Sequence, residues 1–330
     1  MTSTNVKSKR MPQFDLLRIV AILIIFNYHF CNEIGAHQSV FYEYKNGGWG
    51  SVGTCIFFIL SGYMIHMTCV SSDMKSYFKK RFLSIFPPLW ISFVIAYLIT
   101  SLQQSNFLWG GNPLKLVLSF AGFDTYAVLY GLLTYACVGE WFTGMIIFLY
   151  VAYLLLRVLI KKAPVVTTIV LAVLYFAESM FAIQPIVPPD SSVFTGLALF
   201  WLGMLIQEHP DLLKFSYIKV FVAVAAAALV LFVPLPVVGN VLPWKNLLGI
   251  ALFYLLINDF AYIPYGDNGK EVLKYFSNIS FIIYLTHHFV IFKVMELLPT
   301  KPMLTKYMVS LAVTVVVSIL ISKVCNKIKK

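Results

Sequence analysis

Long, continuous runs of apolar residues dominate the chain and restrict it to one class of fold. Of its 330 residues, 60% are hydrophobic and only 12% are charged, with a mean hydropathy of +0.83. A soluble domain is roughly 45–50% apolar, whereas a membrane helix needs about 20 apolar residues in succession. The runs fall near residues 13–32, 50–69, 84–102, 141–160, 164–182, 193–208, 217–233, 244–261, 277–297 and 306–324. We therefore predict an all-α, polytopic transmembrane helical bundle with about ten spans.

The distribution of basic residues sets the predicted orientation. With ten spans and a cytosolic N-terminus, most of the 25 Lys and Arg residues are cytosolic, as the positive-inside rule requires. The basic residues left on or toward the outside are Lys45, Lys115, Lys245, Lys293, Lys301 and Lys306. An eleventh span at 114–136 would reverse this bias downstream. Residues 103–139 are therefore expected to form an outer loop, which can dip into the membrane where protein buries it. Both termini are expected to be cytosolic.

One integral-membrane domain is expected over residues 1–330. Residues 1–12 form a short basic cytosolic tail, and no small-residue cleavage site follows the first apolar run, so we expect that run to be retained as a helix. The loops are too short for an independent domain, and no soluble C-terminal domain is expected. The net charge of +11 gathers at the ends of the apolar runs, which argues against a nucleic-acid partner. The five cysteines lack metal-ligand spacing, so we predict buried thiols and no metal site.

Two ionisable residues, Arg18 and His29, stand inside the first apolar run. Such side chains at membrane depth are energetically costly, usually face a protein interior and mark a functional site. Eleven residues turn a helix by about 1100°, so the two side chains share one face and lie roughly 16 Å apart along the axis. Asp15 falls near the same stripe. We therefore expect this stripe to be the centre of the site.

Two further segments allow both a structural and a functional interpretation. In the second run, Ser61-Gly62 either lets two helices pack closely or contributes to a site. A basic stretch precedes Pro87-Pro88; it is either a topology anchor followed by a helix break or the cationic mouth of a phosphorylated-cofactor site. Its residues are Lys79, Lys80 and Arg81.

The remaining polar groups suit acid–base chemistry. Glu140 and Trp141 open the run at 141–160, where a carboxylate gains from the helix dipole. In the run at 277–297, His287 and His288 point about 100° apart, so we expect at most one to join a given site. The histidines interpreted as incidental are His37, His66 and His209. Without a phosphate loop, a dinucleotide fingerprint or HExxH, this set favours general base catalysis on a hydroxyl.

Five motifs occur in order between residues 14 and 288. They are FDLLRIVAILIIFNYH with its Arg, ten residues and His; FFILSGYMI; the basic stretch before IFPP; GEWF; and ISFIIYLTH. Together they resemble the acyltransferase-3 family of membrane-bound O-acyltransferases, which acylate bacterial surface sugars. No hydrolase-like C-terminal domain is expected for this chain, so it resembles the stand-alone polysaccharide O-acetyltransferases.

The resemblance implies roles for individual residues. Arg18 and His29 fit the family's paired motif, while Glu140 and His287 resemble its acidic residue before the fourth helix and its histidine on the ninth. Arg81 fits the first arginine of an Arg-x-x-Arg motif, but Ser84 stands where the second is expected, unless a neighbouring lysine compensates. The expected catalytic residues are His29, Arg18, Glu140 and His287; Arg18, Lys79, Lys80 and Arg81 would bind the cofactor; Ser61, Trp141 and Tyr284 would contact the acceptor.

The implied activity is transfer of an acetyl group from acetyl-CoA to a hydroxyl of a surface polysaccharide or lipid-linked glycan, in the bacterial plasma membrane. His29 would act as general base or accept the acetyl group briefly. A transporter or exporter of polysaccharide or lipid-linked sugar would also fit ten helices with buried polar residues. A sensory or scaffolding protein would need Arg18 and His29 as a structural pair, which their separation of roughly 16 Å disfavours.

Overall fold

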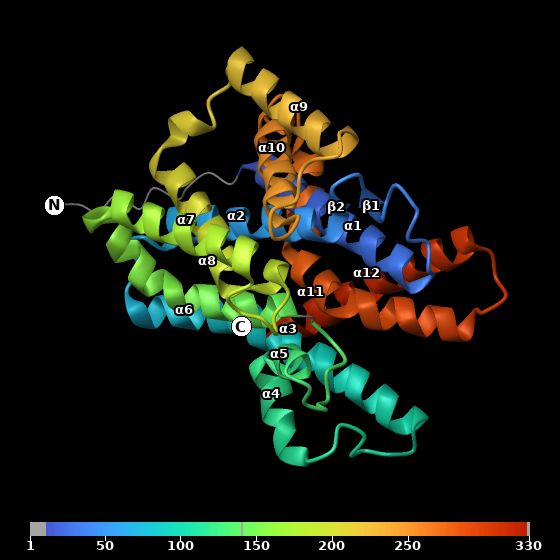
Figure 1. Ribbon diagram of the computed structural model, residues 1–330. Coiled ribbons are helices and arrows are strands. Elements are labelled where there is room, and N and C mark those ends of the chain that lie inside the picture. The colour runs from blue at the N-terminus through green and yellow to red at the C-terminus, as the bar shows by residue number, and fades with distance from the viewer. Residues whose placement is uncertain (1–10, 140, 329–330) are drawn as a thin grey trace.

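The computed structural model describes residues 11–139 and 141–328, and this part of the chain is mainly helical (Figure 1). Its α-helices are α1 (Pro12–Glu33), α2 (Trp49–Cys69), α3 (Met74–Gln103), α4 (Leu116–Ala121), α5 (Asp124–Leu129), α6 (Trp141–Lys162), α7 (Pro164–Phe181), α8 (Val193–Glu208), α9 (Tyr217–Phe232), α10 (Leu242–Ala261), α11 (Asp267–Leu297) and α12 (Met303–Ile328). Three 3-10 turns are η1 (Pro113–Lys115), η2 (Pro189–Ser191) and η3 (Pro210–Leu212), and a short hairpin pairs β1 (Glu43–Tyr44) with β2 (Gly47–Gly48).

Each of the ten predicted apolar runs coincides with a helix of the structure. Within the described residues, seven helices are long and apolar enough to cross a membrane: α1, α2, α3, α6, α7, α11 and α12. Two others, α8 and α9, are apolar but shorter, at 16 residues each. The fold is therefore that of a helical, multi-pass membrane protein. The total of ten spans and the cytosolic placement of both termini stay predictions.

Helix α3 differs from the prediction at its two prolines. It runs without interruption from Met74 through Pro87 and Pro88, so the interpretation of these prolines as a helix break is wrong. The helix begins where the Asp73 side chain accepts a hydrogen bond from the Ser76 backbone N–H at 2.9 Å, which caps its first turn. Both prolines are buried, and packing against neighbouring helices lets a membrane helix tolerate the backbone bonds that proline removes.

The segment 103–139 contains only short helices. Helices α4 and α5 have six residues each, far fewer than the roughly 20 that span a bilayer. Trp90 of α3 donates to the carbonyl oxygen of Phe120 at 2.8 Å, which ties α4 against the side of α3. The segment thus folds onto the bundle, as the prediction of a non-spanning loop requires.

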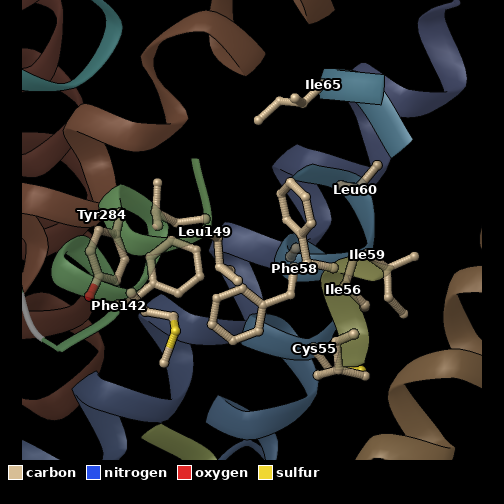
Figure 2. Packing of buried hydrophobic residues seen from close by; sticks show 14 of the residues in the cluster. Cys55, Ile56, Phe58, Ile59, Leu60, Ile65, Phe142, Leu149 and Tyr284 are labelled. Atoms are coloured by element: carbon tan, nitrogen blue, oxygen red, sulfur yellow. The ribbon is translucent and has the colours of Figure 1, made fainter. Parts of the chain in front are cut away.

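Helices α2 and α8 touch backbone to backbone. A Cβ atom added to Gly62 would stand 1.9 Å from the Phe200 carbonyl oxygen, and one added to Gly203 would stand 2.1 Å from that of Ile59. The packing interpretation of Ser61-Gly62 is therefore confirmed for Gly62. Beside this contact, the ring of Phe142 from α6 lies between those of Phe58 and Tyr284, with both centroid distances 5.0 Å (Figure 2).

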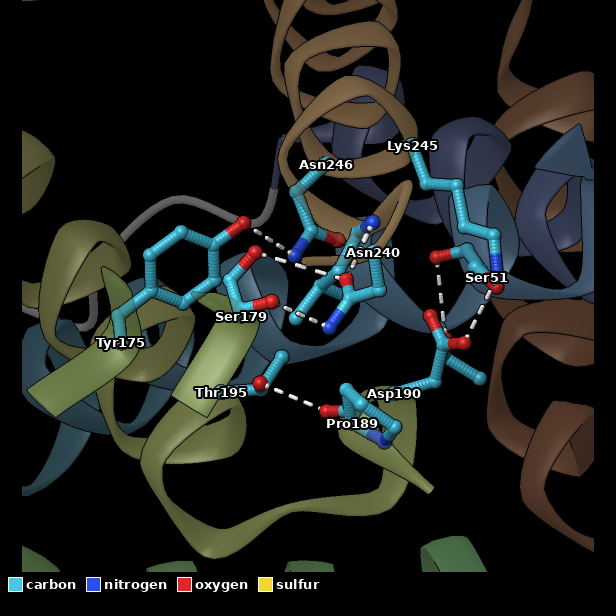
Figure 3. A network of polar contacts seen from close by, with 11 residues as sticks. Ser51, Tyr175, Ser179, Pro189, Asp190, Thr195, Asn240, Lys245 and Asn246 are labelled. Atoms are coloured by element: carbon cyan, nitrogen blue, oxygen red, sulfur yellow. Dashed lines mark hydrogen bonds and ion pairs between the residues drawn. The ribbon is translucent and has the colours of Figure 1, made fainter. Parts of the chain in front are cut away.

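A polar network joins α7, η2 and α10 (Figure 3). Lys245 pairs with Asp190 at 2.8 Å, and Asn246 donates to the hydroxyl of Tyr175 at 3.0 Å. Asn240 donates to the carbonyl oxygen of Ser179 at 2.7 Å. These bonds hold α7, η2 and α10, which lie far apart in the sequence, together on one side of the bundle.

Candidate functional site

A cavity of about 500 Å³ lies among six helices of the bundle. Its lining combines residues from α1, α2, α3, α6, α11 and α12: among them are Arg18, Ser61, Arg81, Phe142, Tyr284 and Asn326. Arg18 stands near the start of α1 and Asn326 near the end of α12, so the two ends of the described chain meet at this cavity. That arrangement fits the prediction that both termini lie on one side of the membrane.

Arg18 is held at the cavity wall by α11. Its Nη1 donates a hydrogen bond to Ser277 Oγ at 3.0 Å, and Ser277 is itself buried. The Arg18 side chain is half-buried. The guanidinium therefore has a fixed position and still borders the cavity.

Arg81 is positioned by aromatic rings. Its guanidinium carbon lies 5.5 Å from the ring centroid of Tyr150 and 6.0 Å from that of Tyr77, within cation–π range. Its Nη2 donates to the sulfur of Cys69 at 3.8 Å. No carboxylate of residues 11–139 or 141–328 pairs with Arg81, and its buried Nε finds no partner there. The positive charge of Arg81 is therefore not neutralised by a described acidic side chain.

The other residues of the basic stretch have different positions. Ser84 lines the cavity, but its hydroxyl donates back to the Arg81 carbonyl oxygen at 2.7 Å. Lys79 and Lys80 are exposed and do not belong to the cavity lining. Among the described residues of that lining, Arg18 and Arg81 are the cationic ones. The cavity thus brings together two of the four predicted cofactor-binding residues.

Three histidines form a cluster beyond the cavity. The His29 ring centroid lies 5.1 Å from that of His287 and 5.0 Å from that of His288. The expectation that at most one of the adjacent histidines would join the site is wrong, because a ring on α1 fits between two side chains that diverge on α11. His288 Nε2 also pairs with a carboxylate oxygen of Glu33 at 3.0 Å.

The hydrogen bond of His287 fixes its tautomer. Its Nδ1 lies 2.7 Å from the carbonyl oxygen of Tyr284, and a carbonyl oxygen can only accept. Nδ1 therefore carries the proton, and Nε2 is the basic nitrogen of the neutral ring. Because His287 is fully buried, this nitrogen is held in one orientation within the bundle.

Tyr284 connects the cavity with the histidine cluster. It belongs to the cavity lining, and its ring centroid lies 5.7 Å from that of His287. The separation between the arginine cavity and the histidines is therefore spanned by one aromatic side chain. Ser61, also predicted to contact the acceptor, lines the same cavity.

The alignment of α1 with α11 explains why both ends of the predicted stripe reach the site. Arg18 contacts Ser277, and His29, eleven positions later, contacts His287, ten positions after Ser277. The two helices thus run in the same direction with nearly matched steps. The prediction that Arg18 and His29 share one helix face is confirmed. Asp15, placed near the same stripe, is buried.

The last two predicted site residues are Glu140 and Trp141, and α6 begins at Trp141. Glu140 lies outside the described residues. Its neighbour Gly139 donates its backbone N–H to the carbonyl oxygen of Leu285 at 3.3 Å, which holds the segment against α11. Trp141 is half-buried beside Phe58, with ring centroids 6.2 Å apart, and does not line the cavity.

His66 is a buried polar residue that the sequence interpretation treated as incidental. It is 0% exposed, its Nε2 lies 2.5 Å from a carboxylate oxygen of Glu208, and its Nδ1 lies 3.3 Å from the hydroxyl of Tyr153. It therefore joins the ends of α2 and α8 as a structural contact, and its interpretation as incidental to the chemistry stays a prediction. Nothing in the sequence pairs His66 with a residue 142 positions away. His37 and His209 are exposed.

Residues 11–323 match the family model Acyl_transf_3, which is described as an acyltransferase domain. This match covers nearly the whole chain, so the chain belongs to the acyltransferase-3 family. No curated protein and no solved structure matches it. Together with the membrane helices, the family identifies a multi-pass membrane acyltransferase.

Proposed function

We propose that this membrane acyltransferase transfers an acetyl group from acetyl-CoA to a hydroxyl of a cell-surface polysaccharide or glycan precursor in a bacterial plasma membrane. The observation that carries the proposal is the continuity of the site. The cavity bordered by Arg18 and Arg81 reaches the histidine cluster through Tyr284. A phosphate-bearing donor and an acid–base group thus have adjoining places in one bundle.

The cavity has the chemistry of a donor site. Arginine binds phosphate oxygens strongly through charge-assisted hydrogen bonds, and Arg18 and Arg81 approach the cavity from different helices. The two prolines of α3 add backbone acceptors, because proline has no N–H to bond the carbonyl four residues earlier. Ser84 precedes Pro88 by four residues, and both line the cavity. The Ser84 carbonyl is therefore suited to accept from an amide N–H of the donor's pantetheine arm.

The histidines are suited to move the proton and orient the groups in the transfer step. His29 takes the proton of the acceptor hydroxyl as its oxygen attacks the acetyl carbonyl carbon; the carbon–sulfur bond then breaks, and the leaving thiolate takes up the proton. His287 orients His29 or the acceptor through its fixed Nε2. Glu140 is proposed to assist in the same orienting role. Lys79 and Lys80, exposed beside the basic mouth, would attract the anionic donor without lining its cavity.

The proposal is tested with membranes that contain the His29→Ala variant and radiolabelled acetyl-CoA. We expect transfer to fall by at least about 100-fold, since general base catalysis contributes roughly 10²–10⁴-fold. His37→Ala is the matched control, because His37 is an exposed histidine stacked on Tyr42 outside the cluster. Full transfer by folded, inserted His29→Ala protein would exclude the catalytic role. Thioester-independent movement of sugar by the wild type would favour a transporter.

A further inference from the structure

A second cavity is an apolar groove between α3, α11 and α12. Its volume is about 450 Å³, and its walls include Ile95, Ile99, Val290, Val294, Val313 and Ile321. Ile95, Ile99 and Val313 are each about 40% exposed, so the groove opens on the outer surface of the bundle. In a membrane that surface faces hydrocarbon.

The length of the groove matches one leaflet. Along α11 its lining extends from Thr286 to Leu297, a rise of roughly 16 Å at about 1.5 Å per residue. Half of the hydrocarbon thickness of a bilayer is about 15 Å. An extended hydrocarbon chain that enters from one leaflet therefore fits along this wall.

Positive charge gathers at one end of the groove. Lys293 lines it, and Lys301 and Lys306 follow in the turn and first residues that lead into α12. These are three of the six basic residues predicted on or toward the outside, where the positive-inside rule disfavours them. Glu296 pairs with Lys293 at 2.8 Å and is the one acidic residue in the sequence from 289 to 310, so this end keeps a net positive charge.

The other end of the groove borders the functional site. Thr286, which lines the groove, directly precedes His287 of the histidine cluster. Val138, also in the lining, directly precedes Gly139, whose N–H is bonded to Leu285. The hydrocarbon tail of a lipid in the groove would thus end beside the histidine cluster.

We propose that this groove binds the hydrocarbon chain of an anionic lipid whose phosphate lies near Lys293. The lipid site follows from the apolar walls and the lysines. Charge complementarity selects a phosphate-bearing lipid over a neutral one, because the lysine-rich end would otherwise face the membrane surface without an anion.

The test is photo-crosslinking of the purified full-length protein with a photoreactive polyprenyl phosphate. The groove variant is Val313→Trp, whose indole would occupy the cavity. The matched control is Val316→Trp on the same helix, because Val316 is 55% exposed and does not line the groove. We expect Val313→Trp to reduce labelling roughly tenfold or more and Val316→Trp to retain it. Equal labelling of both variants and the wild type would overturn the site.

A second comparison tests the headgroup. Lys293→Gln should weaken binding of the polyprenyl phosphate and leave a neutral polyprenol of the same length unaffected. Equal competition by phosphatidylcholine would show a general lipid surface, and disulfide-linked dimers of a Val313→Cys variant would show a second copy in the groove. Either result contradicts the proposal. Labelling needs no acetyl-CoA, so loss of the lipid site and loss of acetyl transfer in His29→Ala are separate outcomes.

Discussion

The rings of His29 and His287 lie with their centroids 5.1 Å apart, although one residue belongs to the first helix and the other to the eleventh. The contact forms because α1 and α11 pack side by side in the same direction, with Arg18 bonded to Ser277 at the other end of the pair. One helix pair thus positions both the cationic and the imidazole parts of the site.

Removal of the fixed basic nitrogen of His287 should reduce catalysis. His287→Gln keeps a polar side chain of similar reach but has no ring Nε2 fixed in the position that orients His29 or the acceptor, so we expect kcat for acetyl transfer to fall by roughly 10²-fold. The KM for acetyl-CoA should change little, because the donor arginines are untouched. An unchanged kcat in correctly folded protein would remove His287 from the site.

The positive charge of the donor cavity should set the KM for acetyl-CoA: removing a cation should raise this KM, and adding one should lower it. Arg81→Gln should raise the KM for acetyl-CoA by roughly tenfold, since a hydrogen bond to a charged group contributes about 1.5–3 kcal/mol. Ser84→Arg should lower that KM, because it places a further guanidinium at an exposed position of the cavity lining.

Ser84→Gln is the control of similar length without charge, and Lys79→Gln tests an exposed cation outside the lining. Initial rates over a range of acetyl-CoA concentrations measure each KM. If Ser84→Gln and Ser84→Arg behave alike, the effect comes from side-chain size, and the electrostatic account of the cavity fails.

The close contact of α2 with α8 should be intolerant of any side chain at Gly62. Gly62→Ala places a methyl group 1.9 Å from the Phe200 carbonyl oxygen, and such overpacking typically costs about 1–3 kcal/mol. We expect a lower Tm in detergent. Gly269→Ala on α11 is the matched control, because a Cβ there meets nothing within 4 Å. Equal Tm values for the two variants would contradict the packing account.

The cap of α3 should make the protein's stability depend on pH. The Ser76 backbone N–H bonded to Asp73 holds the pKa of this carboxyl below its usual value. The cap therefore contributes stability above the unfolded pKa of about 3.9, and this contribution is lost as the pH falls through the lower folded pKa.

Asp73→Ala should accordingly lower the Tm at neutral pH, with a difference from wild type that shrinks as the solution is acidified. Asp73→Asn retains a capping oxygen without a titrating charge, so its Tm should stay closer to that of the wild type at neutral pH. Thermal unfolding of the full chain in detergent at several pH values measures both. A difference between Asp73→Ala and wild type that grows on acidification would refute the assignment.

Much of the architecture was predictable because membrane insertion leaves a strong local signal. Ten apolar runs marked ten helices, and the spacing of Arg18 and His29 placed them on one face, since helical periodicity needs no knowledge of neighbours. The prolines of α3 were misinterpreted for a complementary reason. Whether a helix continues through Pro87-Pro88 depends on the packing around it, which the local sequence does not encode.

What the sequence by itself determined is the membrane class, the helices and the shared face of Arg18 and His29. Only the tertiary structure decided which residues meet: both His287 and His288 at His29, Arg81 rather than Lys79 or Lys80 at the cavity, and Glu208 at His66. The physical reason is that helix formation depends on neighbours within a few residues. A site among packed helices depends on which faces meet, and those faces come from segments hundreds of residues apart.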